Sequence, residues 1–195
     1  MAQQFNKRIF TVKDFFHIMD LAIGSFGKYR KAKKENLIKD DFKERIILAV
    51  TEVNGCELCS YFHTKEALKS GLSEDEISSM LTGNTENVHK DEAIAIFFAQ
   101  HYAETGGHPD KDAWKRLVQT YGQTKAEGIL AVIRMIMMGN AHGIAFGAFK
   151  NRLKGDSVKK SSLSKELGVL IGGILLIPIV LIKNLIPATR AAIKI

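Results

Sequence analysis

Apolar residues recur at intervals of three and four positions along almost the whole chain, and strictly alternating stretches are scarce. This spacing places apolar side chains along one face of an α-helix. Only three prolines occur in 195 residues, and none lies between Met1 and His108, so little interrupts helical structure. The pattern therefore predicts an all-α fold.

Start and stop signals divide this pattern into separate helices. Ser73-Glu74-Asp75-Glu76 is a capping box, and glycines follow several expected helix ends. Asn54-Gly55 breaks the chain between two apolar periodic stretches. The expected helices span residues 11–33, 41–53, 56–70, 73–81, 91–105, 109–121 and 124–153. The last carries four glycines, for which close helix packing is a better interpretation than a ligand site: Gly128, Gly139, Gly143 and Gly147.

The segment that follows has a different composition. Leu167 to Ile182 is sixteen residues without a charge, and it contains Pro178. A spanning helix needs roughly 20 apolar residues, so three interpretations stay open. The segment packs on the domain or across an oligomer interface, it lies on a membrane between flanking lysines, or it forms a tilted or extended span. We divide the chain into a helical domain, residues 1–153, and a basic linker with an apolar helical tail, residues 154–195.

The formal net charge is +7, and much of the excess lies in two runs, Lys28 to Lys34 and Lys150 to Lys165. Such runs are most often solvated faces, with an anionic membrane surface as the next interpretation. No nucleic-acid-binding motif is visible, so we expect no nucleic-acid partner. Met1 to Arg8 lacks the apolar core of a signal peptide. We expect a cytoplasmic protein, with membrane association through residues 167–182 as the alternative.

The chain has two cysteines, Cys56 and Cys59, three positions apart. A single CxxC pair in a reducing compartment indicates thiol chemistry or metal binding rather than a structural framework. A thiol reacts as its thiolate, which a helix N-terminus stabilises. His63 follows Cys59 by four positions and Cys56 by seven, so all three side chains share one helix face. The sequence therefore predicts a redox-active dithiol with an adjacent histidine.

Several alternatives remain at this point. Either Glu44 or Glu52 could orient His63 or take its proton, and spacing does not choose between them. Zinc would need a fourth ligand beyond Cys56, Cys59 and His63, and the candidates are His89, His101 and His142. A c-type haem is excluded because Ser60 follows the second cysteine. Two inert core cysteines are the remaining interpretation.

The stretch from Glu44 through Val53-Asn54-Gly55-Cys56 to His63 resembles a known family. A glutamate, eleven residues, CxxC, three residues and a histidine is the pattern of the alkylhydroperoxidase D (AhpD) and carboxymuconolactone decarboxylase superfamily. The continuation from Ala67 to Ser73 is also similar to the family, and the resemblance covers about residues 40–82. Some members carry a histidine between the cysteines, where this chain has Leu58.

The resemblance implies an all-α, AhpD-like fold that assembles into trimers or hexamers. In AhpD-like peroxidases the second cysteine attacks the peroxide, the first resolves it as a disulfide, and glutamate and histidine relay protons. Cys59 would then be peroxidatic, Cys56 resolving, and Glu44 with His63 the relay. The substrate would be a peroxide or disulfide, and a thioredoxin-like or lipoyl dithiol would supply electrons. No cofactor or metal is expected.

The leading hypothesis is a thiol-dependent peroxidase or disulfide oxidoreductase. A carboxymuconolactone decarboxylase-type enzyme is the second, although that branch generally lacks a redox CxxC. The third is a membrane-associated redox-sensing or interaction protein, localised by its tail.

Overall fold

A computed structural model of the chain describes residues 5–84 and 88–185, and within them it forms eight α-helices and no strand. The predicted all-α fold is therefore confirmed. The helices are α1 (Val12–Lys34), α2 (Asp40–Asn54), α3 (Glu57–Lys69), α4 (Glu74–Leu81), α5 (Ala93–Glu104), α6 (Lys111–Tyr121), α7 (Gln123–Leu153) and α8 (Leu163–Leu185).

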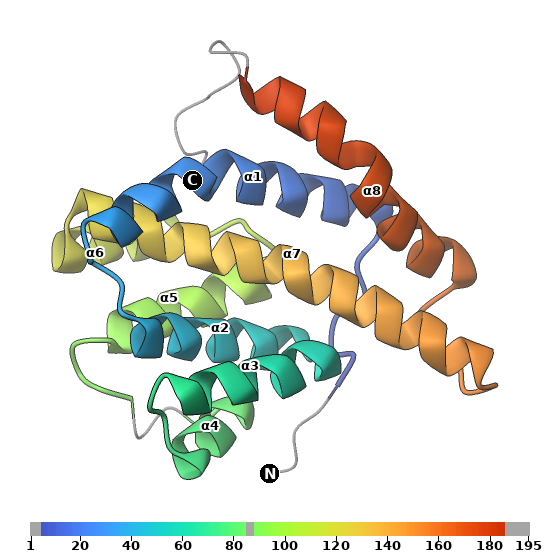
Figure 1. The fold of residues 1–195 in the computed structure, drawn as a ribbon, viewed down its shortest axis with the longest axis horizontal. Helices are drawn as coiled ribbons and strands as arrows, with labels where there is room; N and C mark the ends of the chain where they lie inside the picture. Colours follow the sequence, from blue (N-terminus) through green and yellow to red (C-terminus); the bar gives the residue numbers. More distant parts are fainter. Residues whose placement is uncertain (1–4, 85–87, 186–195) are drawn as a thin grey trace.

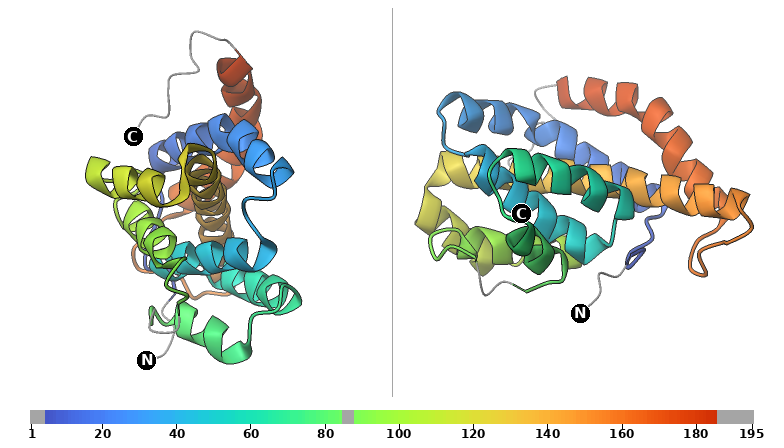
Figure 2. Two further views of the ribbon diagram at one scale, coloured as in Figure 1. Left: turned by 90° about the vertical axis from the view of Figure 1, so that its left-hand side faces the viewer. Right: turned by 60° about the horizontal axis from the view of Figure 1, so that its bottom comes forward.

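The long helix α7 forms the centre of the molecule and contacts α1, α2, α3, α5, α6 and α8. Figure 1 shows α1 and α8 on one side of α7, with α2 and α3 on the other, and the side views agree (Figure 2). The sequence of α7 is apolar on several faces, and residues 129–134 are all buried. A helix that is apolar nearly all round is stable only when other elements surround it.

The predicted boundaries agree with the structure within about two residues for α1, α2, α3, α4, α6 and α7. Thr11 caps α1, and Cys56 is the N-cap of α3. The capping box at Ser73 forms only in part. The Ser73 hydroxyl accepts the backbone N–H of Glu76, but the Glu76 carboxylate pairs with Arg45.

Gly55 makes the turn that folds α3 back against α2. Its φ of +71° lies in the left-handed region that glycine adopts most easily. The N-terminal segment also passes close to it, and a Cβ at position 55 would lie 2.8 Å from the backbone nitrogen of Lys7. Both requirements favour glycine, and the turn places the start of α3 beside the end of α2.

Gly128 confirms the expectation that small residues let helices approach. A Cβ at this position would lie 2.4 Å from the Cβ of Ala32, where α7 packs on α1. Gly139 has no comparably tight neighbour, and Gly147 has none within 4 Å.

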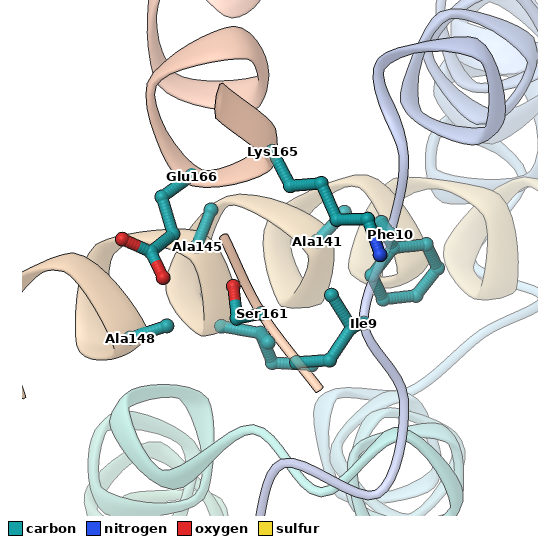
Figure 3. A pocket seen from close by; sticks show the side chains of 9 residues that line it. Ile9, Phe10, Ala141, Ala145, Ala148, Ser161, Lys165 and Glu166 are labelled. Atoms are coloured by element: carbon teal, nitrogen blue, oxygen red, sulfur yellow. The ribbon is translucent and has the colours of Figure 1, made fainter. Parts of the chain in front are cut away.

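The predicted apolar tail is part of α8, which is longer than its uncharged core. α8 packs on both α1 and α7. At its start Glu166 is buried and pairs with Arg152 at the end of α7, with both N–O distances 2.8 Å. Figure 3 shows this junction, where Glu166 and Lys165 lie over Ala141 and the rest of the α7 surface.

The space left at this junction is only about 10 Å³, so α8 is closely joined to the domain there. Two helices of the described chain, α7 and α8, are long and apolar enough to cross a membrane. Most of α7 is buried within the protein, whereas most of the apolar part of α8 is not.

Candidate redox site

Cys56 and Cys59 are joined by a disulfide at the N-terminus of α3. Cys56 is fully buried, and its sulfur accepts the backbone N–H of Cys59 at 3.2 Å. Cys59 retains 8% of its surface. Both sulfurs lie in the first helical turn, where free N–H groups and the helix dipole favour negative charge. The two thiols therefore differ in access and share an environment that favours thiolate.

Gly143 of α7 closes one side of the disulfide. A Cβ there would lie 2.6 Å from Sγ of Cys56 and 2.9 Å from Sγ of Cys59, closer than real Cβ atoms approach. The same Cβ would lie 3.8 Å from Cβ of Leu58. The α7 backbone therefore shields both sulfurs, and only a glycine leaves room for them. No sequence pattern distinguishes Gly143 from the other small residues of this helix.

Glu44 and His63 form a pair beside the disulfide. Nδ1 of His63 lies 2.8 Å from Oε2 of Glu44, although the two residues are nineteen positions apart. Glu44 is 3% exposed. His63 follows Cys59 by one helical turn, which places their Cβ atoms about 5–6 Å apart. Cys56, Cys59 and His63 thus lie at and after the start of α3, and Glu44 contacts His63 from α2.

Two basic residues of α2 set the charge around this pair. Lys43 Nζ lies 3.3 Å from the other carboxylate oxygen of Glu44. Burial alone would lower the pKa of Lys43, but the carboxylates of Asp40 and Glu44 raise it above its usual value. The next residue, Arg45, is buried and pairs with three carboxylates, those of Asp41, Glu76 and Glu92. Arg45 therefore ties α2 to α4 and α5 directly beside Glu44.

Glu52, the alternative carboxylate, lies elsewhere. It forms an ion pair with Lys7 of the N-terminal segment and approaches the Gly83 turn. The geometry therefore selects Glu44 over Glu52 as the partner of His63.

The structure does not bring the proposed fourth zinc ligands to the cysteines. No group of three or more His, Cys, Asp or Glu side chains with metal-site geometry occurs in residues 5–84 and 88–185. His101 Nε2 accepts the backbone N–H of Asp110, and His142 packs against Phe15. His89 is exposed at the turn before α5.

The outer side of the disulfide is apolar. Leu58, Tyr61 and Phe62 of α3 are all exposed, and so is Phe146, one turn beyond Gly143 on α7. A separate hollow of about 360 Å³ lies between α5 and α6, next to Phe97 and His101, and contains no residue of the cysteine site. Organic molecules that reach Cys59 therefore meet an apolar surface.

Buried amides lie behind Cys56. Thr51, whose carbonyl accepts the Cys56 N–H at 3.4 Å, places its hydroxyl 3.3 Å from Oδ1 of Asn140. Nδ2 of Asn140 and both polar atoms of the Asn54 side chain are buried without a hydrogen-bond partner. Asn140 precedes Gly143 by one helical turn, so the inner side of the dithiol is polar while its outer side is apolar.

Comparison with known proteins finds a family that is similar to part of this chain. Residues 25–97 match the carboxymuconolactone decarboxylase family, and this stretch contains Glu44, both cysteines and His63. The match confirms the resemblance seen in the sequence, and the all-helical structure agrees with the AhpD-like fold. A Bacillus subtilis (strain 168) protein named "Uncharacterized protein YdfG" is 26% identical over 120 residues, which is 60% of this chain and 81% of that protein. No solved structure matches the chain significantly.

Proposed function

We propose that this protein is a thiol-dependent peroxidase or disulfide oxidoreductase whose redox centre is Cys56–Cys59. The observation that carries the proposal is a CxxC pair at a helix N-terminus, followed one turn later by His63, whose ring is hydrogen-bonded to the buried Glu44. A redox dithiol needs a stabilised thiolate and a nearby group that moves protons, and this arrangement offers both.

Access assigns the attacking sulfur. Cys56 is fully buried, whereas Cys59 retains 8% of its surface, so Cys59 is the less buried of the two. Cys59 thiolate attacks one peroxide oxygen and the O–O bond breaks, which gives Cys59 sulfenic acid and, after protonation of the leaving oxygen, an alcohol or water. Cys56 thiolate then attacks the sulfenic sulfur, a disulfide forms, and hydroxide leaves and is protonated to water.

The Glu44–His63 pair serves these proton transfers. Hydrogen bonding of Nδ1–H to the carboxylate leaves Nε2 of neutral His63 with its lone pair. Nε2 accepts a proton from a thiol, and the resulting imidazolium, stabilised by Glu44, donates it to the leaving oxygen.

Reduction follows the reverse order. The dithiol donor attacks Sγ of Cys59, the less buried cysteine, and Cys56 leaves as a thiolate that the Cys59 N–H stabilises. The second thiol of the donor then attacks the donor's own sulfur in the mixed disulfide. Cys59 leaves as a thiolate, and the donor departs as a disulfide. Thioredoxin-like and lipoyl dithiols both fit this chemistry.

The test is stoichiometric oxidation of the fully reduced protein, followed by mass spectrometry. One equivalent of hydrogen peroxide or an organic hydroperoxide should remove two hydrogens and close an intramolecular Cys56–Cys59 disulfide. Glutathione disulfide serves as the second oxidant, because it separates a peroxidase from a general disulfide oxidoreductase. Persistence of two free thiols with every oxidant would refute the proposal.

A further inference from the structure

The outward face of α8 is apolar along its length. Its most exposed side chains are Ile174 at 75%, Leu175 at 65% and Ile182 at 61%. Val169 and Val180, which are fully buried, lie on the opposite side of the helix against the domain. Successive residues turn by about 100°, so Ile171, Ile174, Leu175, Pro178 and Ile182 lie together opposite these valines. The uncovered side of α8 thus carries no charge over about three turns.

The charges around this face are positive. Residues 157–185 contain four lysines and a single acidic residue, Glu166. Glu166 is 1% exposed and paired with Arg152, so its negative charge is neutralised within the protein. Lys159 and Lys160 are exposed in the loop that leads into α8. The apolar face is therefore bordered by basic residues.

Both ends of α8 are attached to the domain. Arg152 holds Glu166 at the start, and Asp20 of α1 binds Lys183 and Asn184 at the end. A spanning orientation would break these contacts and expose the inner valines. Attachment at both ends instead holds the outward face in place on the domain.

We propose that α8 docks this protein onto an anionic lipid bilayer, lying in the plane of the interface. An amphipathic helix binds there by immersing its apolar face among the acyl chains, and flanking lysines attract acidic headgroups. The isoleucine-rich face supplies the apolar area, and the lysines of residues 157–185 favour a negatively charged surface. This inference is independent of the dithiol chemistry, because no residue of the cysteine site lies on α8.

Flotation of the full-length protein with vesicles tests the docking. Vesicles of phosphatidylcholine with roughly 30% phosphatidylglycerol have a negative surface that attracts basic segments. They should carry the protein upward, and pure phosphatidylcholine should carry much less. The double substitution Ile174→Glu and Leu175→Glu should reduce binding more than about tenfold, because two large apolar side chains no longer enter the interface. Both positions are exposed, so the fold should persist, and circular dichroism checks this.

Phe97→Glu is the matched control. Phe97 is an equally large exposed apolar residue, on α5, which has no contact with α8. This variant should float like the unchanged protein, and alkaline carbonate should release the bound protein from the vesicles.

Failure of the unchanged protein to float on anionic vesicles would overturn the proposal, as would equal flotation of the double variant. Retention after carbonate would overturn the in-plane orientation. A dimer that the double substitution converts to monomers without any flotation would assign the face to a second copy instead.

Discussion

The carboxylate of Glu44 meets the imidazole of His63 across the turn between α2 and α3, with 2.8 Å between Oε2 and Nδ1. Glu44 is on α2 and His63 on α3, so the contact depends on how Gly55 folds one helix back along the other. The pair fixes the orientation of the histidine ring one turn beyond Cys59.

Glu44→Gln should slow peroxide consumption by about tenfold to a hundredfold, because a neutral amide stabilises the imidazolium less than a carboxylate does. The variant should still be reduced by dithiothreitol, since that step uses a strong external dithiol. Glu52→Gln is the matched control: it removes a carboxylate from the same helix that pairs with Lys7 rather than His63. Stopped-flow peroxide decay measures both, and equal rates for Glu44→Gln and the unchanged enzyme would contradict the relay.

Cys59→Ser and Cys56→Ser should fail at different steps. Loss of Cys59 removes the accessible nucleophile, so peroxide consumption should fall to background. Loss of the buried Cys56 removes the resolving thiol, so one turnover should leave Cys59 as a sulfenic acid. A sulfenic-acid trap with mass spectrometry should label the Cys56→Ser protein after peroxide and leave Cys59→Ser unlabelled. The reverse labelling would exchange the two roles.

Local patterns in the sequence were sufficient to predict the helices. Apolar periodicity, the Ser73 cap and the stop at Gly71 all act within a few residues, and α1 to α4 begin and end close to the predicted positions. The ends of α8 were less predictable. Its first turn is polar and is fixed by the Arg152–Glu166 pair, which joins two helices and leaves no local pattern.

The cysteine site was likewise only partly predictable from local sequence. Helical spacing placed Cys56, Cys59 and His63 on one face, because all three belong to one helix. Spacing did not distinguish Glu44 from Glu52, since that depends on how α2 and α3 pack after the turn, and the family resemblance favoured Glu44. Gly143 lies eighty-four positions beyond Cys59, and only the packing of α7 on α3 identifies its contact with the sulfurs.

Acid should loosen the packing of α8 through His142. This side chain lies between Phe15 and Gly173, and burial lowers its pKa below the usual 6.5, an effect that a bond to the Met138 carbonyl only partly offsets. The unfolded chain therefore takes up the proton first as the pH falls. The stabilisation is complete above about pH 6.5 and is lost as the pH falls through the lower, folded-state pKa.

Thermal unfolding at pH 7.5 and at pH 5.5 measures this effect. The melting temperature should fall on acidification, and His142→Leu should reduce that fall. Burial also lowers the pKa of His17, with a further contribution from His108 stacked against it, so part of the pH dependence should persist in His142→Leu. An unchanged pH dependence in this variant would show that His142 does not contribute.

Gly143→Ala should destabilise the oxidised protein more than the reduced one. A Cβ at this position would lie 2.6 Å from Sγ of Cys56 and 2.9 Å from Sγ of Cys59. In the disulfide the two sulfurs are held together, whereas free thiols can rotate away from the new methyl group. Overpacking of this kind costs about 1–3 kcal/mol. If only the disulfide form carries this cost, the reduction potential of the Cys56–Cys59 couple rises by roughly 20–60 mV.

Gly139→Ala provides the control on the same helix. Its Cβ would meet only the end of Ile136 at 3.8 Å, so alanine should stabilise α7 by about 0.5–1 kcal/mol in both redox states. Redox titration against glutathione gives the potential of each protein, and thermal melts with and without dithiothreitol give the stability of each state. The prediction requires a positive shift in potential for Gly143→Ala alone. Equal destabilisation of its oxidised and reduced forms would mean that Gly143 serves general helix packing and does not govern the redox state of the cysteines.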